Sequence, residues 1–214
     1  MKKVLLAHGS SNASHTEQVE ALAAEVSELL GEEVGVAYLN DQLLPEGARV
    51  LPLFLGEGKH VREDIPSLIA ASVDCELLPA LTEQSDVIAQ MAIDLITRDT
   101  RRINALFVLY RFGGFEKLAT ALYEKMKVCS KHALASLHSE PSVPSLLQHW
   151  QAEALKQISV QPLLLFKGSS LVRLQSMMND VDIEISQGAV LSEHEAFSQL
   201  IADCFKAKAV EDKS

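Results

Sequence analysis

Residues 52–66 read PLFLGEGKHVREDIP, and residues 162–168, PLLLFKG, repeat the beginning of that stretch. Both stretches lead from a predicted buried strand through glycine into a predicted helix. The strand predicted in the first of these stretches, residues 50–55, is apolar on both faces, as strands in helix-covered parallel sheets are. The separation of roughly 110 residues between the two stretches is too long for a solenoid repeat and predicts a duplicated half-domain.

Segments that suit strands and helices alternate along the rest of the chain. This alternation predicts an α/β fold of two similar half-domains, each a parallel sheet flanked by helices. The polar segment 97–102 marks the boundary, so we expect an N-terminal lobe over residues 1–100 and a C-terminal lobe over residues 101–214. The predicted strands are 3–7, 34–39, 50–55, 76–78, 105–110, 132–137, 158–166 and 181–185. The predicted helices are 16–30, 64–71, 86–96, 115–126, 145–155, 169–178 and 193–205.

The two predicted copies are unequal. Residues 39–50 leave room for a turn but not for a packed helix, whereas the second copy keeps a helix at 145–155. The polar residues differ as well. Arg111-Phe112-Gly113 stands about where the first copy has His8-Gly9-Ser10, and Ser170 aligns with His60.

The charge and the cysteines limit the class of protein. Lys and Arg number 19 and Asp and Glu 29, which gives a formal net charge of −10. A general nucleic-acid binder or a polybasic membrane anchor would carry a basic surplus. No apolar run reaches the length of about 18 residues that a membrane span needs, and the N-terminal run is too short for a signal peptide. Three widely spaced cysteines predict free thiols in a reducing compartment. We therefore expect a cytoplasmic protein without nucleic-acid or membrane partners.

Two histidines follow predicted strands. His8 comes directly after the first strand, and His60 lies in the glycine-containing turn after the third. Ligands bind at the carboxyl ends of parallel strands, so we expect both side chains at one edge of one sheet. A neutral imidazole binds divalent metals or accepts a proton near pH 7. The alternative for each histidine is a loop or capping role.

Charged residues surround His60 before a predicted helix. Asp64 is a natural N-cap, and Pro66 fits the first helical turn. Lys59 and Arg62 add positive charge where a helix N-terminus also favours anionic groups. The alternative for both cations is solvated surface charge.

The combination of His8-Gly9-Ser10 with PLFLGEGKHVREDIP resembles the sirohydrochlorin chelatases of the CbiX/SirB type, the class II chelatases, in their two-lobed form with a degenerate second half. The resemblance implies a ferrochelatase-like fold of two α/β lobes. It also implies a lyase that inserts Co²⁺ or Fe²⁺ into sirohydrochlorin, on the route to cobalamin or sirohaem. His8 and His60 would then be the metal-binding and catalytic pair, and Ser10 and Gly58 would contact the substrate.

The chemistry of the two histidines suits this reaction. Imidazole is a better ligand for Co²⁺ and Fe²⁺ than for Mg²⁺ or Ca²⁺. Two histidines leave coordination positions open for the nitrogens of a macrocycle, and one imidazole can also take up a pyrrole proton.

The chain departs from the family pattern after the second predicted strand. The family usually carries Phe-Leu-Glu there, and this chain has Tyr-Leu-Asn, ending in Asn40. An amide is a weak neutral ligand and not a base. Asp41 is an adjacent substitute. His138 and Glu140 of the second copy are further auxiliary candidates, with a loop before the next helix as the alternative role for that segment.

Sirohydrochlorin carries many carboxylates, so a protein of net charge −10 must gather cations where the substrate binds. The glycine-containing loops of the two copies supply them. If both lobes face one cleft, five cations would flank it: Lys59, Arg62, Arg111, Lys167 and Arg173.

Two further functions stay open. The first is a non-catalytic metal or tetrapyrrole carrier derived from a chelatase, which Asn40 and the short connection favour. The second, weaker one is a hydrolase that uses Ser10 beside His8, although no G-x-S-x-G elbow is present. No G-x-x-x-x-G-K-[ST] loop occurs, so no nucleotide cofactor is expected. The substrate is expected to be a tetrapyrrole, and the protein a monomer or a homodimer.

Overall fold

Parallel strands separated by helices build both halves of the chain. The computed structural model describes residues 1–9, 13–97 and 103–207. These residues group into two units. Unit 1 combines Met1–Glu83 with the described part of Glu195–Ser214, and unit 2 spans Gln84–His194.

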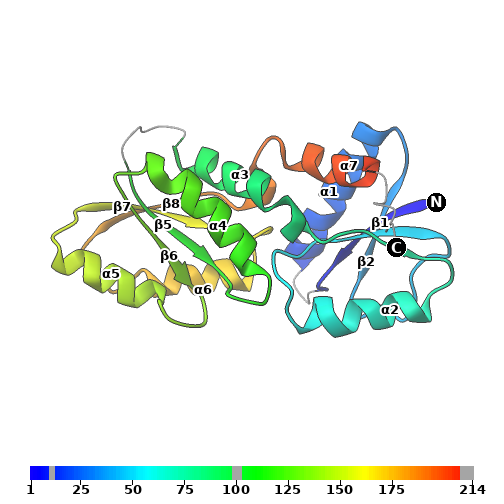
Figure 1. The fold of residues 1–214 in the computed structure, drawn as a ribbon, viewed down its shortest axis with the longest axis horizontal. Helices are drawn as coiled ribbons and strands as arrows, with labels where there is room; N and C mark the ends of the chain where they lie inside the picture. Colours follow the sequence, from blue (N-terminus) through cyan, green and yellow to red (C-terminus); the bar gives the residue numbers. More distant parts are fainter. Residues whose placement is uncertain (10–12, 98–102, 208–214) are drawn as a thin grey trace. The chain divides into compact units, whose positions relative to one another are not determined.

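Unit 1 is a parallel sheet with helices on both faces (Figure 1). Its elements are β1 (Lys2–Ala7), α1 (Ala13–Leu30), β2 (Val34–Tyr38), β3 (Ala48–Pro52), the π-helix η1 (His60–Asp64), α2 (Ile65–Ala71), β4 (Glu76–Leu77), the start of the 3₁₀ turn η2 (Leu81–Gln84) and α7 (Phe197–Lys206). Within the described residues the strand order is β2-β1-β3-β4, so β1 is central. Helices α1 and α7 cover one face of the sheet, and α2 covers the other.

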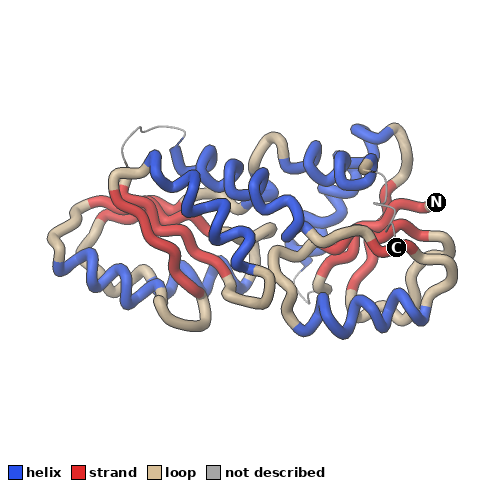
Figure 2. Tube along the Cα trace, in the orientation of Figure 1, coloured by secondary structure: helices blue, strands red, loops and turns tan. Residues whose placement is uncertain are grey.

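Unit 2 repeats this arrangement (Figure 2). Its elements are α3 (Ser85–Thr97), β5 (Asn104–Leu109), α4 (Phe115–Lys125), η3 (Met126–Val128), β6 (Lys131–Ser136), α5 (Val143–Ala152), β7 (Gln157–Pro162), α6 (Ser169–Met177), β8 (Glu184–Gln187) and η4 (Leu191–Glu193). The described strands lie in the order β6-β5-β7-β8, which is the order of unit 1 shifted by four strands. The predicted α/β class with two parallel sheets flanked by helices is therefore confirmed.

The cores of the two units form on equivalent faces of their sheets. In unit 1, Val4 and Leu6 of β1 are buried against Ile65 and Leu68 of α2. In unit 2, the corresponding strand β5 packs against Trp150 of α5 and against α6. Side chains of a strand alternate between the two faces of the sheet. The residue that follows β1, at position 8, and the residue that follows β5, at position 110, therefore lie on the same face as these core residues.

Two helices pack against the unit that is built mainly from the other half of the chain. Helix α3 packs against α4 and β7 in unit 2, and α7 packs against α1 and β3 in unit 1. Arg49 of β3 holds the end of α7 by donating to the carbonyl oxygen of Phe205 at 2.9 Å. The boundary is predicted in the segment 97–102, of which residues 98–102 lie outside the described residues. The division near residue 100 stays a prediction about the sequence repeat.

The two units differ where the sequence indicates a lost crossover. Between β2 and β3 the described residues hold only turns and bends, whereas α5 fills the equivalent connection of unit 2. Ser142 caps α5 by accepting a hydrogen bond from the Ser145 backbone N–H. The strands predicted over 50–55 and 158–166 both end at the prolines 52 and 162, after which the chain leaves the sheet.

The three cysteines, Cys75, Cys129 and Cys204, are free thiols. Burial raises the pKa of Cys129, and burial together with the nearby Asp203 raises that of Cys204 to about 11. Both of these thiols are therefore protonated at neutral pH. None of the described helices is both long enough and apolar enough to cross a membrane.

Candidate metal centre

The pairing of β1 with both neighbours brings three segments together at one edge of the sheet in unit 1. Ala7 at the end of β1 pairs with Tyr38 at the end of β2, and Leu6 pairs with Pro52 at the end of β3. His8 follows β1 directly, and the π-helix η1 begins at His60 after the glycine-containing turn. This carboxyl edge is where parallel sheets bind ligands.

His8 and His60 face each other through their Nε2 atoms, which lie 3.0 Å apart. The ring centroids are 4.5 Å apart and the ring planes are nearly perpendicular, at 80°. The other nitrogen of each ring has its own partner. His8 Nδ1 donates to the carbonyl oxygen of Gly9 at 3.0 Å, and His60 Nδ1 donates to Asp64 Oδ2 at 2.6 Å.

These partners fix the tautomers, because a carbonyl and a carboxylate oxygen can only accept a hydrogen bond from the Nδ1–H groups. Both Nε2 atoms therefore present lone pairs to the space between the rings. Two lone pairs in contact repel each other, and a shared proton or a cation between them removes that repulsion. The 3.0 Å separation also suits two adjacent ligands on one metal ion, each at a bond length of about 2.1 Å.

Asp64 lies at the N-cap position of helix α2, as predicted from the sequence, but its side chain does not cap the helix. The backbone of Asp64 is helical (φ −72°, ψ −43°), and its side chain makes no capping hydrogen bond. The residues before it already form the π-helix, a feature that is common at functional sites. The carboxylate of Asp64 instead holds the ring of His60, as carboxylates orient metal-binding histidines. Pro66 lies in the first turn of α2, as predicted.

The two histidines line a pocket of about 530 Å³ that lies entirely within unit 1. Its polar lining is made by imidazole, amide, hydroxyl and carboxylate groups. The lining residues are His8, Gly9, Thr16, Tyr38, Leu39, Asn40, His60 and Asp64. Across residues 1–9, 13–97 and 103–207, no three or more His, Cys, Asp or Glu side chains are grouped to hold a metal ion.

Asn40 lines the pocket, and its side-chain amide contacts Gly9. Gly9 has a φ of +30°, and a Cβ atom placed on it would lie 2.5 Å from Asn40 Oδ1. The amide of Asn40 therefore packs against the backbone beside His8. Asp41, the substitute considered from the sequence, points elsewhere: its Oδ2 accepts the backbone N–H of Tyr38 at 2.8 Å and closes the turn after β2.

Sequence reasoning missed Thr16 and Tyr38 as lining residues. The position of Tyr38 at the end of β2, level with Ala7 and one residue from the level of His8, is the signal that could have found it. Thr16 gave no signal, because its place in the pocket depends on how the first turn of α1 packs. His15 lies beside Thr16, and burial together with the charge of His8 lowers its pKa.

Other predicted substrate contacts lie around this pocket without lining it. Gly58 begins the turn, and its carbonyl oxygen accepts the backbone N–H groups of Val61 and Arg62. Arg62 lies 3.9 Å from the carboxylate of Glu57, a weak exposed ion pair. Lys59 precedes the π-helix with an exposed side chain. Ser10 lies outside the described residues.

The remaining candidates lie in unit 2. His138 and Glu140 follow β6, and the Glu140 carboxylate accepts the Ser142 backbone N–H at 2.8 Å. Hydrogen bonds from Ser142 and Ser145 lower the pKa of Glu140. Lys167 pairs with the carboxylate of Glu193 at 2.5 Å. Arg111 follows β5 by two residues, and Arg173 is exposed on α6. That both units line one cleft stays a prediction.

The strand register corrects the alignment between the two copies. Leu6 pairs with Pro52 in unit 1, and Val108 pairs with Pro162 in unit 2. His8 therefore corresponds to Tyr110, one residue before the predicted Arg111. The other counterpart, Ser170, accepts or donates a hydrogen bond with the Tyr110 hydroxyl at 2.9 Å. A neutral tyrosine–serine contact thus replaces the imidazole pair in unit 2.

With this geometry in place, comparison with known protein families gives one match. The CbiX family matches residues 2–93 and 113–208. This chain belongs to the CbiX family. No match was found among curated protein sequences.

Solved structures show the same fold for this CbiX-family chain. CbiX of denitrifying bacteria, the terminal enzyme of sirohaem biosynthesis there, is 17% identical with a TM-score of 0.71, covering 98% of this chain and 100% of that one. The sirohydrochlorin chelatase SirB of Bacillus subtilis subspecies spizizenii, in complex with cobalt, is 16% identical with a TM-score of 0.62, covering 96% and 93%.

A third structure is larger than this chain. DR2241 of Deinococcus radiodurans, a multi-domain protein with similarity to chelatases, is 19% identical with a TM-score of 0.69. The match covers 100% of this CbiX-family chain and 56% of DR2241. These likenesses establish the chelatase fold, and the roles of individual residues rest on the geometry described above.

The contact between Gly9 and Asn40 in this CbiX-family chain gives a stability prediction. Gly9→Ala should lower the free energy of unfolding by about 2 kcal/mol or more, because it adds strain at positive φ and a clash with the amide. Gly31→Ala is the matched control. Gly31 has a φ of +67° with nothing within 4 Å of an added Cβ, so this variant should lose only about 1 kcal/mol.

Denaturant unfolding of both variants measures the difference. Combining Gly9→Ala with Asn40→Ala should recover the excess loss, since the second change removes the clashing amide. Equal losses for Gly9→Ala and Gly31→Ala would show that Asn40 does not pack against Gly9.

Proposed function

We propose that the chain is a class II chelatase that inserts Co²⁺ or Fe²⁺ into sirohydrochlorin, on the route to cobalamin or sirohaem. The observation that carries this proposal is the pair of Nε2 lone pairs of His8 and His60, 3.0 Å apart at the wall of an open pocket. Two imidazoles bind a divalent ion of this class and leave several coordination positions for other ligands.

The proposed reaction balances in protons as well as in metal. The divalent ion enters the macrocycle as two pyrrole N–H protons leave it. Each Nε2 lone pair that releases the metal becomes a base, so the His8 and His60 imidazoles together accept the two protons. The carbonyl of Gly9 and the carboxylate of Asp64 keep both Nδ1–H groups in place throughout. Asn40 contributes a neutral amide oxygen at the wall of the pocket and accepts no proton.

A non-catalytic carrier of metal or tetrapyrrole is the second candidate. It is favoured by Asn40, which stands in the pocket where the family usually carries a glutamate base. A carrier would bind the ion or the macrocycle tightly without accelerating its metallation. Cytoplasmic residence is part of the proposal and is supported by the free thiols of the three cysteines.

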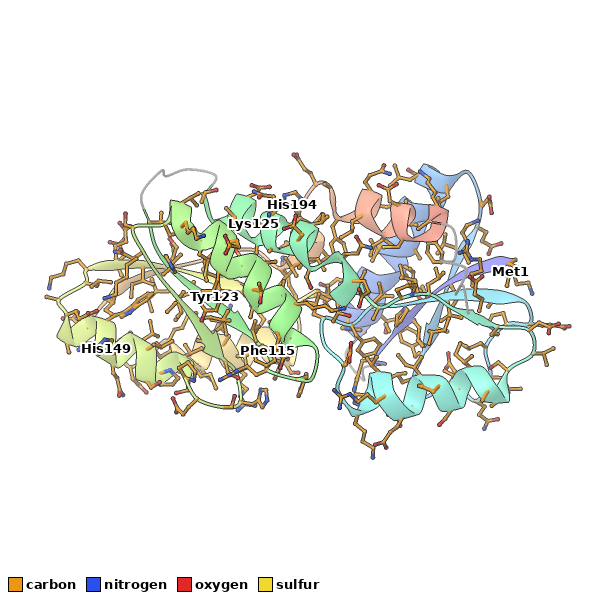
Figure 3. All side chains as sticks on the ribbon, viewed as in Figure 1. Met1, Phe115, Tyr123, Lys125, His149 and His194 are labelled. Carbon is orange, nitrogen blue, oxygen red and sulfur yellow. The ribbon has the colours of Figure 1, made fainter. Side chains whose placement is uncertain are left out.

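The two imidazoles are tested by substitution. His8→Ala and His60→Ala should each reduce the rate of metal insertion by about 100-fold or more, because each removes one ligand and one proton acceptor. Insertion is followed by the absorbance of sirohydrochlorin under anaerobic conditions with Co²⁺ and then Fe²⁺. His149→Ala is the matched control, since His149 is exposed on α5 (Figure 3) and should leave the rate unchanged.

The same assay separates the two candidates. A chelatase accelerates insertion over the spontaneous reaction, and the two variants lose that acceleration. Binding of Co²⁺ or of the macrocycle with no rate above the protein-free reaction would instead establish the carrier.

Asp64 is tested as a positioning residue. Asp64→Asn should weaken Co²⁺ binding by about 10-fold to 100-fold, because an amide holds the Nδ1–H of His60 less strongly than a carboxylate does. Asp64→Glu should restore part of the affinity. Titration with Co²⁺, read by its visible absorption, measures both variants beside Glu63→Gln, an exposed neighbour that should bind as the unchanged protein does. Unaltered affinity in Asp64→Asn would remove Asp64 from the site.

A further inference from the structure

Aromatic rings gather at the strand ends of unit 2. Tyr110 follows β5, Phe112 lies in the turn before α4, and His138 follows β6. The ring centroids of Tyr110 and Phe112 are 5.1 Å apart with planes only 5° from parallel. His138 lies 5.0 Å from Phe112 and 5.4 Å from Tyr110, with its plane tilted by about 30° from both. The planes of the three rings are therefore close to parallel.

In unit 2, this cluster lies at the position where unit 1 has the histidine pair. The strand register makes Tyr110 the counterpart of His8. Ala7 pairs with Tyr38 and Leu109 with Ser136, so His138 is likewise the counterpart of Asn40. Unit 2 thus keeps a ligand-binding edge of the parallel sheet, with aromatic surface in place of two facing imidazoles.

One ring of the cluster packs against the core of unit 2, and the other two are exposed to solvent. Tyr110 packs against the core of unit 2, and its hydroxyl is held by Ser170. Phe112, in contrast, is 45% exposed, and His138 is exposed as well. Because Tyr110 is held in place and Phe112 stacks on it, the exposed ring of Phe112 loses little conformational freedom when it binds a ligand.

The segment that carries two of these rings also carries a cation. Arg111, between Tyr110 and Phe112 in sequence, donates to the carbonyl oxygen of Glu140 at 2.6 Å. Its guanidinium group also lies 5.0 Å from the centre of the Phe115 ring. Phe115 is the first residue of α4 (Figure 3). These two contacts hold the guanidinium between Phe115 and the loop after β6 that also carries His138. Aromatic rings together with a fixed guanidinium on the same segment suit a planar, conjugated ligand that carries carboxylates.

We propose that Tyr110, Phe112 and His138 form a stacking site for the plane of a polycarboxylate tetrapyrrole, with Arg111 binding one of its carboxylates. The identity of this ligand rests on the proposed function. All four of these residues belong to unit 2.

The test uses a metal-free octacarboxylate porphyrin as probe and the full chain. Phe112→Ala should weaken binding by about ten-fold or more, the effect expected from loss of one aromatic stacking partner. Phe112→Leu should lose most of the affinity as well, and Phe112→Tyr should keep it, because stacking needs a ring. Tyr123→Ala is the matched control. Tyr123 is 52% exposed on α4 and takes no part in the cluster, so this variant should bind as the unchanged protein does (Figure 3).

Quenching of porphyrin fluorescence reads the affinity, and Arg111→Gln should both weaken binding and reduce its dependence on salt. Equal affinities for Phe112→Ala and the unchanged protein would overturn the proposal, as would equal losses in Phe112→Leu and Phe112→Tyr.

The outcome is separable from that of the proposed function. Phe112→Ala should bind Co²⁺ as the unchanged protein does, because the imidazole pair lies in unit 1. Loss of porphyrin binding in Phe112→Ala would support the stacking site even if the unchanged protein inserted no metal. Rapid metal insertion with unaltered porphyrin binding in Phe112→Ala would support the chelatase and overturn the stacking site.

Discussion

The parallel pairing of β1 with both β2 and β3 determines where every candidate side chain of unit 1 lies. That pairing sets the ends of the three strands level, with Ala7 beside Tyr38 and Leu6 beside Pro52. His8 then needs no further element to reach the edge, and the turn after Pro52 has only to carry His60 back toward it. Burial of Val4 and Leu6 against α2 holds the register, because a shift by one residue would turn the apolar side chains out of the core.

The chemistry of the pair depends on what lies behind each ring. The carbonyl of Gly9 and the carboxylate of Asp64 occupy both Nδ1–H groups, so both Nε2 atoms direct lone pairs to the same point. This arrangement is unfavourable when that point is empty and favourable when a cation fills it. A site of two imidazoles in an open pocket therefore combines affinity for a divalent ion with room for a second set of ligands. Insertion of a metal into a macrocycle needs both properties, since the ion must bind and then leave.

Much of the architecture could be predicted from the sequence, because alternation of apolar runs and the repeated PLFLGEG and PLLLFKG stretches report burial directly. The details that could not be predicted depend on tertiary position. An aspartate before a helix suits either a cap or a histidine partner, and the π-helix that places His60 beside Asp64 decides between them. Tyr110 was passed over because the predicted strand 105–110 included it, so the loop was expected to begin at Arg111. The structure ends β5 at Leu109, and the strand register aligns the pairs Leu6–Pro52 and Val108–Pro162. The contact of Asn40 with Gly9 left no pattern in the sequence at all.

The central claim is that His8 and His60 together hold the metal through their Nε2 atoms. X-ray absorption spectroscopy of the Co²⁺-loaded protein measures this most directly, since it gives the type, number and distance of the ligands. The account predicts two imidazole nitrogens at about 2.1 Å, falling to one in His8→Ala and in His60→Ala. A shell of oxygen ligands alone, unchanged in both variants, would contradict it.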